Sequence, residues 1–163
     1  MESVLIVDDE ESIRKTLSIL LKRNGFRVDE ATDGMEAFEM MANSPYDLVI
    51  ADLNMPAMGG IDLLKRVKEG SGDTEVIILT AYGAIQSAVE AIKLGAYDYL
   101  TKPFEPKDIM IKVRNAIEKK RLATEVRHLK RALRDSFSKK TIVGQSPAIV
   151  RLLEFIDQVS ATD

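Results

Sequence analysis

The feature that most limits how this chain can fold is a five-fold alternation of short apolar runs with amphipathic segments. The apolar runs predict strands at residues 3–7, 26–31, 48–52, 75–80 and 97–101. The segments between them carry apolar residues at helical spacing, as at Ile13, Leu17 and Leu21 in the first. The connections are too long for hairpins, so we expect parallel strands with helices on both faces.

The later helices follow the same pattern. Apolar residues at helical spacing predict a helix after Gly59-Gly60 and another before Gly95, the second marked by Ile85, Val89 and Ile92. The predicted fold is therefore α/β: a doubly wound, five-stranded parallel sheet followed by a long linker helix. We expect it to be flavodoxin-like with the strand order 2-1-3-4-5, because that order is common among known sheets of this kind and not because the spacing of residues dictates it.

The last predicted helix has no obvious end. It begins at Pro106, and no Gly or Pro occurs from Lys107 to Lys140. Its distal apolar residues step by 4, 3 and 4 positions, which is heptad spacing and predicts pairing with a second copy of the helix. The predicted dimer linker consists of Leu122, Val126, Leu129 and Leu133.

Charge is divided unevenly along the chain. Residues 1–101 hold 18 Asp and Glu against 9 Lys and Arg, whereas residues 102–140 hold 5 against 13. This shift indicates a boundary near residue 105. The basic residues lie all around the predicted helix and are interrupted by Glu118, Glu125 and Asp135, so we interpret them as a solvated coiled-coil face rather than a nucleic-acid site.

Composition removes several classes of function. The chain has no Cys, which excludes a disulfide, a thiolate zinc site and a cysteine nucleophile. No apolar stretch approaches the roughly 18 residues that a membrane span needs, and the first residues lack the pattern of a secretory signal. We therefore expect a cytoplasmic protein with no membrane partner.

Polar residues stand at the ends of four predicted strands. Asp8 and Asp9 follow the first strand, Asp52 ends the third, Thr80 the fourth and Lys102 the fifth. The carboxyl ends of parallel strands meet at one edge of the sheet, so these side chains should lie close together.

Three clustered carboxylates are costly unless a cation neutralises them, and a set of oxygen donors without His or Cys points to Mg²⁺. A carboxylate beside such a cation can attack phosphorus and form an aspartyl-phosphate. Lys102 can balance the charge of the phosphoryl group, and Thr80 can donate a hydrogen bond to it.

The segments around these residues resemble the motifs of a response-regulator receiver domain of two-component systems. They are Ile6-Val7-Asp8-Asp9-Glu10, the stretch from Asp52-Leu53-Asn54-Met55-Pro56 to Gly59-Gly60, Thr80-Ala81, and Lys102-Pro103-Phe104.

The resemblance implies particular roles. Asp52 would accept a phosphoryl group from a sensor histidine kinase. Asp9 would bind Mg²⁺ directly, with Asp8 assisting and the backbone carbonyl of Asn54 as a further ligand. Thr80 and Tyr99 would form a switch pair, and a cis peptide bond before Pro103 would direct Lys102.

A second, shorter resemblance narrows the family. The long helix followed by Ile142-Val143-Gly144-Gln145-Ser146-Pro147 is similar to the region before the ATPase domain of NtrC-type sigma-54-dependent transcriptional activators. It implies a receiver domain at 1–120, an extended fifth helix and coiled-coil linker at 106–137, and the start of a truncated ATPase domain at 138–163.

The predicted function is thus a phosphorylation-dependent switch. The chain would catalyse only its own phosphorylation and dephosphorylation. It would form a homodimer through the linker and the face made by the fourth helix, fifth strand and fifth helix. The full-length protein would act with sigma-54 RNA polymerase and DNA.

Two alternatives from other classes remain. A Mg²⁺-dependent aspartyl-phosphate phosphohydrolase needs a second carboxylate two residues after the nucleophile, where this chain has Asn54. A flavin-binding module needs a phosphate loop after the first strand, where the acidic run from Asp8 to Glu11 would repel a phosphate. Both are disfavoured.

Overall fold

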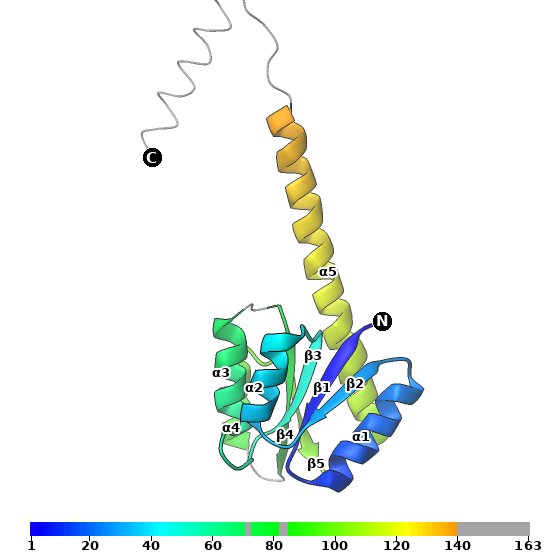
Figure 1. The fold of residues 1–163 in the computed structure, drawn as a ribbon, viewed down its shortest axis with the longest axis vertical. Coiled ribbons are helices and arrows are strands. Elements are labelled where there is room, and N and C mark those ends of the chain that lie inside the picture. The colour runs from blue at the N-terminus through cyan, green and yellow to red at the C-terminus, as the bar shows by residue number, and fades with distance from the viewer. Residues whose placement is uncertain (71–72, 82–84, 140–163) are drawn as a thin grey trace, which may run out of the picture. The chain divides into compact units, whose positions relative to one another are not determined.

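A parallel five-stranded sheet forms the centre of the protein (Figure 1). The computed structural model describes residues 1–70, 73–81 and 85–139. The strands are β1 (Ser3–Val7), β2 (Arg27–Ala31), β3 (Leu48–Asp52), β4 (Glu75–Ala81) and β5 (Asp98–Lys102), in the order β2-β1-β3-β4-β5. The predicted fold class and strand order are confirmed.

Five helices follow the strands and cover both faces of the sheet. They are α1 (Glu11–Arg23), α2 (Gly34–Asn43), α3 (Gly60–Glu69), α4 (Ile85–Lys93) and α5 (Pro106–Lys139). Helices α1 and α5 lie on one face, and α2, α3 and α4 lie on the other (Figure 1).

Side chains alternate along each strand, so each face of the sheet has its own apolar core. In β1, Val4 and Ile6 join the layer under α1 and α5, whereas Leu5 and Val7 join the layer under α2, α3 and α4. Every residue of β1 and β3 is buried, as expected for a parallel sheet covered on both faces. The partly exposed β2 forms an edge of the sheet, as its more mixed sequence predicts.

Helix α4 is present, but its buried face differs from the apolar residues that marked it in the sequence. Val89 and Ile92 are 48% and 43% exposed, whereas Ala88 and Ala91 are buried. Small alanine side chains face the core, and the larger residues are left on the surface. Apolar periodicity therefore indicated the helix but not the stripe that packs, because alanine also fits an apolar pattern.

Helix α5 begins at Pro106 as predicted and runs without interruption to Lys139. Ile109 and Val113 are fully buried in the core, and Ile117 packs against it. The chain divides into two compact units, Met1–Leu122 and Ala123–Asp163, and α5 contributes residues to both. The predicted extended piece at 142–145 and the helix after it lie outside the described residues.

The early part of α5 is held at the amino-terminal edge of the sheet by two lysines. The Nζ of Lys120 donates to Oδ1 of Asp47 at 2.7 Å and to the carbonyl of Tyr46 at 3.2 Å. The Nζ of Lys119 lies 2.9 Å from Oε1 of the buried Glu75. These contacts join α5 to the residues just before β3 and at the start of β4.

Over the described residues, no helix is both long and apolar enough to cross a membrane.

Candidate functional site

Asp52 is the last residue of β3 and is only 8% exposed. Its Oδ1 lies 3.0 Å from the Nζ of Lys102, the last residue of β5. By strand alternation both side chains leave the sheet on the face covered by α1 and α5, as do Ile50 and Leu100 two residues earlier. Two strands that are not neighbours thus direct an acid and a base toward each other across β4.

Asp8, directly after β1, completes this buried group and is fully inaccessible to solvent. Its Oδ2 accepts a hydrogen bond from Nζ of Lys102 at 2.7 Å, and its Oδ1 accepts one from the backbone N–H of Glu10 at 2.9 Å. Its own N–H donates to the carbonyl of Ala31 in β2 at 3.3 Å. Asp8 is therefore fixed by contacts from three segments of the chain.

The electrostatics of the site are set by burial and by this shared ammonium. Burial raises the pKa of the Asp52 carboxyl above its ordinary value, and the nearby Asp8 adds to the rise, while Lys102 opposes it. Burial alone would lower the pKa of Lys102, but its hydrogen bonds with Asp8 and Asp52 outweigh that cost and raise it. Lys102 is therefore a permanent cation between two acids.

Asp9 differs from its neighbour because its side chain is exposed. One carboxylate oxygen from each of Asp8, Asp9 and Asp52 lies within 4.8 Å of the others. In an octahedral Mg²⁺ site, ligands at 2.0–2.1 Å stand about 3–4 Å apart, so the spacing suits this cation. The donor set is all oxygen, which also fits Mg²⁺. The residues present therefore fit the predicted cation.

The loop after β3 folds back tightly behind Asp52. Gly60 donates its N–H to the carbonyl of Leu53 at 3.1 Å, and a Cβ at Gly60 would stand 2.3 Å from the backbone oxygen of Asp52. Only glycine allows this approach. Within the loop, Ala57 has a φ of 60°, a left-handed conformation, and Asn54 is exposed. The start of α3 and the Asp52 backbone are thus in direct contact.

Thr80 and Tyr99 occupy the other face of the sheet. Alternation places both with Ile78, on the side of α2, α3 and α4. Thr80 is 1% exposed, and its hydroxyl donates to the carbonyl of Ala81 at 3.4 Å. Tyr99 is 38% exposed, with the Nζ of Lys112 at 5.9 Å from its ring centre.

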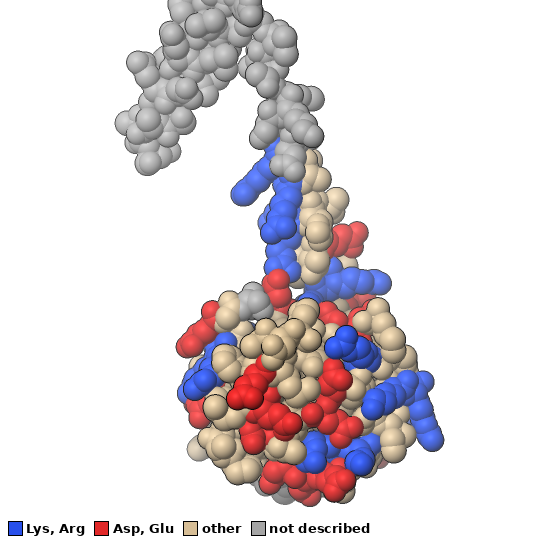
Figure 2. Space-filling model, viewed as in Figure 1, with Lys and Arg blue, Asp and Glu red and all other residues tan. Residues whose placement is uncertain are grey.

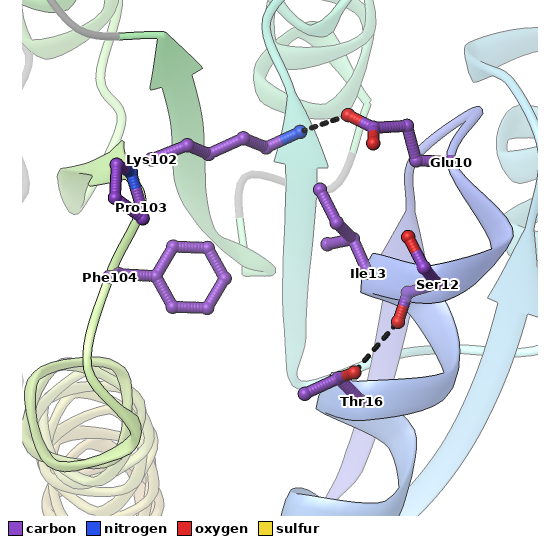
Figure 3. Close-up of a pocket in the computed structure, with 7 residues that line it drawn as sticks. All are labelled: Glu10, Ser12, Ile13, Thr16, Lys102, Pro103 and Phe104. Atoms are coloured by element: carbon purple, nitrogen blue, oxygen red, sulfur yellow. Dashed lines mark hydrogen bonds and ion pairs between the residues drawn. The ribbon is translucent and has the colours of Figure 1, made fainter.

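An open pocket of about 470 Å³ adjoins the site on the α1 side. Figure 3 shows Lys102 extended toward Glu10, with Phe104 facing Ile13 across the pocket. The Nζ of Lys102 lies 3.8 Å from Oε1 of Glu10. The peptide bond between Lys102 and Pro103 is cis, as the motif resemblance implied.

The structure brings Asp8, Asp9, Asp52 and Lys102 into one cluster, whereas strand alternation directs Thr80 and Tyr99 to the other face of the sheet. Sequence reasoning missed Arg14, whose Nη1 donates to the backbone carbonyl of Asp8 at 2.6 Å. The only signal for it was a basic residue in the first turn of a helix, where acidic residues are usual.

Comparison with known proteins agrees with this fold. Residues 4–114 match the response regulator receiver domain family, so the chain belongs to that family. The predicted family is confirmed.

The relatives include longer regulatory proteins. The chain is 37% identical to the regulatory protein AtoC of Escherichia coli K12 over 147 residues, covering 90% of this chain and 32% of AtoC. It is 34% identical to the C4-dicarboxylate transport transcriptional regulatory protein DctD of Rhizobium meliloti, covering 99% of this chain and 35% of DctD. The chain spans about a third of the length of these relatives.

Solved structures give the same result. A receiver domain protein from Clostridium thermocellum aligns with a TM-score of 0.72 at 34% identity, covering 76% of this chain and 99% of that one. NtrX from Brucella abortus, in complex with ADP, aligns with a TM-score of 0.75 at 29% identity, covering 99% of this chain and 35% of NtrX.

Proposed function

We propose that Asp52 accepts a phosphoryl group from a sensor histidine kinase and that this modification regulates the protein of which the chain is part. The observation that carries the proposal is the Lys102 ammonium, held between Asp8 and Asp52 at 2.7 and 3.0 Å. It balances charge at the carboxylate where a phosphoryl group would add roughly 1.5–2 negative charges.

Asp9, Asp52 and the backbone carbonyl of Asn54 are the proposed direct ligands of Mg²⁺, with Asp8 acting mainly through its hydrogen bonds. Both oxygens of Asp8 already accept bonds, from Glu10 and Lys102, whereas Asp9 is exposed. When bound, Mg²⁺ supplies positive charge to the oxygens of the transferring phosphoryl group.

In the proposed reaction an oxygen of the Asp52 carboxylate attacks phosphorus. A bond forms between that oxygen and phosphorus while the bond from phosphorus to the imidazole nitrogen of the donor histidine breaks, leaving an acyl phosphate on Asp52. Lys102 is close enough to follow the new negative charge and stabilise it. We propose that the chain catalyses its own phosphorylation and dephosphorylation only.

Thr80 and Tyr99 are proposed to transmit the change to the face made by α4, β5 and α5. Among the described residues, the Thr80 hydroxyl would give up one long hydrogen bond, to the carbonyl of Ala81. Reversing an equilibrium from 1:99 to 99:1 needs about 5.5 kcal/mol. One charge-assisted hydrogen bond supplies roughly 1.5–3 kcal/mol. The Thr80 bond and the Lys102 contact would therefore have to act together.

Pairing of two copies is the proposed output. The four heptad residues of α5 are between 48% and 58% exposed, and Val89 and Ile92 of α4 and Tyr99 of β5 are exposed as well. Figure 2 shows Lys and Arg side chains along α5, which would remain solvated beside the apolar seam. The full-length protein is proposed to act in the cytoplasm with sigma-54 RNA polymerase and DNA.

Intact mass after incubation with acetyl phosphate and Mg²⁺ tests the central step. We expect one added phosphoryl group that requires Mg²⁺ and disappears in Asp52→Asn. Asp62→Asn is the matched control, because Asp62 is an exposed carboxylate whose ion pair is with Lys65. Phosphorylation that persists in Asp52→Asn, or that never occurs in the wild type, would contradict the proposal.

A further inference from the structure

The two adjacent acids of the site are held in different ways. Asp8 is fixed through its side chain, which accepts bonds from Glu10 and Lys102. Among the described residues no hydrogen bond or ion pair reaches the Asp9 carboxylate. The place of that carboxylate therefore depends on the backbone that carries it.

Arg14 is the side chain that fixes this backbone. Its Nη1 donates to the carbonyl of Asp8 at 2.6 Å, from a partly buried position one turn into α1. The carbonyl of Asp8 and the N–H of Asp9 belong to one planar peptide group. A guanidinium that holds the carbonyl thus sets the orientation of the whole group and the direction in which the Asp9 side chain leaves it.

We propose that Arg14 is a positioning residue for Asp9 and that its bond to the Asp8 carbonyl sets the affinity of the acidic site for a divalent cation. The inference rests on the proposed function, because it assumes that Asp9 binds the cation. It assigns to α1 a role in building the site that does not involve contact with the cation or the phosphoryl group.

The direction in which the cation affinity changes when Arg14 is replaced distinguishes a positioning role from a purely electrostatic one. Arg14 is itself a cation near a cation site, so removal of its charge alone would strengthen metal binding. Loss of its hydrogen bond would instead release the loop and weaken binding. Loss of outer-shell partners typically costs 10–100-fold in metal affinity, and we expect about a ten-fold loss here because the bond is to the backbone.

Binding of Mn²⁺, followed by the loss of its free-ion signal in electron paramagnetic resonance, measures the affinity directly and without phosphorylation. Arg14→Ala should bind about ten-fold more weakly than the wild type. Arg14→Lys keeps the charge and can still donate a hydrogen bond, so its affinity for Mn²⁺ should lie between those of the wild type and Arg14→Ala. Lys15→Ala is the matched control, because Lys15 is the next residue of α1, is exposed, and forms a surface ion pair with Glu11 at 3.4 Å.

Thermal unfolding in EDTA is measured for each variant to establish that it is folded without a bound cation. A folded Arg14→Ala whose affinity is unchanged or higher would overturn the inference, as would a Lys15→Ala that loses as much. If Arg14→Ala does not fold, Arg14→Lys decides the question, since wild-type affinity in that variant would contradict a role that depends on the guanidinium geometry.

Comparison of Mn²⁺ binding by the wild type and by Asp9→Asn tests the proposed metal site independently of the role of Arg14. Wild-type binding of Mn²⁺ that Asp9→Asn abolishes supports the metal site, whatever Arg14 does. Absence of binding that depends on Asp9 would overturn both proposals. A normal site with unaffected Arg14 variants would overturn this inference alone.

Discussion

Lys102 carries the electrostatic balance of the acidic site at the scale of single residues. Its side chain is 17% exposed and contacts two carboxylates that are less exposed still. Without the ammonium, Asp8 and Asp52 would face each other as buried like charges. The raised pKa of Asp52 shows that burial already acts against its ionised form even with Lys102 in place.

We predict that Lys102→Gln lowers the free energy of unfolding in EDTA by about 2 kcal/mol. This is less than the roughly 3–5 kcal/mol for breaking a fully buried pair, because the Asp52 side chain retains some contact with solvent. Mg²⁺ should recover part of the loss by supplying the missing positive charge. Urea unfolding followed by circular dichroism, with EDTA and with Mg²⁺, measures both effects.

Lys65→Gln is the control, since its pair with Asp62 is exposed and should be worth less than 1 kcal/mol. If Lys102→Gln and Lys65→Gln lowered the free energy of unfolding equally, the buried contacts of Lys102 would contribute no more to stability than an exposed ion pair.

A second prediction at the scale of single residues concerns Gly60. Alanine there would place Cβ 2.3 Å from the backbone oxygen of Asp52, so the loop or the strand end must move. We expect Gly60→Ala to destabilise the fold by about 1–3 kcal/mol, the usual cost of overpacking, and to slow phosphorylation because the displaced atom belongs to the acceptor residue. Urea unfolding and the rate of mass increase with acetyl phosphate test the two effects.

Asp62→Ala, on the exposed side of the same helix, should change neither quantity appreciably. A Gly60→Ala protein with wild-type stability and rate would mean that α3 can shift without disturbing Asp52.

At the scale of elements, α5 is joined to the sheet by polar contacts as well as by its apolar face. Burial alone would raise the pKa of Asp47, but hydrogen bonds from Lys120 and from the N–H of Ser3 outweigh it and lower the pKa. A carboxylate with a lowered pKa stabilises the fold above the pKa of the unfolded chain. That contribution is lost as the pH falls through the lower, folded-state value.

We therefore predict a pH-dependent difference between the wild type and Asp47→Asn. At pH 7 the free energy of unfolding of the variant should be about 1 kcal/mol lower than that of the wild type. The reason is that Lys120 then donates to a neutral amide instead of a carboxylate, at a position that is partly exposed. The difference should narrow as the pH falls below about 5, where the Asp of the unfolded chain begins to protonate. Urea unfolding across this range gives the comparison, and a gap that is constant with pH would contradict the ionic origin.

At the scale of the whole molecule, the acidic site and its proposed switch pair, Thr80 and Tyr99, lie on opposite faces of one sheet. Asp52 and Lys102 share the face of α1 and α5, and Thr80 and Tyr99 share the face of α4. A change at Asp52 can affect both faces because β4 and β5 carry residues to each of them. The proposed consequence is a change in how two copies of the chain pair.

We predict that sedimentation velocity distinguishes the phosphorylated from the unphosphorylated protein and that Leu129→Glu removes the dimer. Leu129 is 58% exposed in the single chain, so a carboxylate there costs little until a second helix covers it. Arg131→Glu adds a carboxylate on the outer side of the same helix and should leave the dimer intact. Dimers that tolerate Leu129→Glu would exclude this seam as the interface.

Much of this protein follows from its sequence because the relevant physics is local. Period-two and helical patterns identify strands and helices, and the absence of Gly and Pro after Pro106 predicted the long α5 that is observed. Strand ends also predicted that Asp8, Asp9, Asp52 and Lys102 gather at one edge, since parallel strands share their direction. Thr80 was expected beside them, but strand alternation directs it to the other face of the sheet. The fold class, the strand order and the family were all predicted correctly.

Tertiary structure alone decided how these residues are used. Asp8 and Asp9 are neighbours in sequence, yet one is fully buried and the other exposed, because only Asp8 meets the Lys102 that arrives from β5. Val89 and Ile92 looked like core residues but lie outside, because α4 packs through alanines. A basic residue in the first turn of α1 was the only hint of Arg14, and its bond to the Asp8 carbonyl could not be assigned from the sequence, because a backbone acceptor is the same at every residue and only the folded chain selects one.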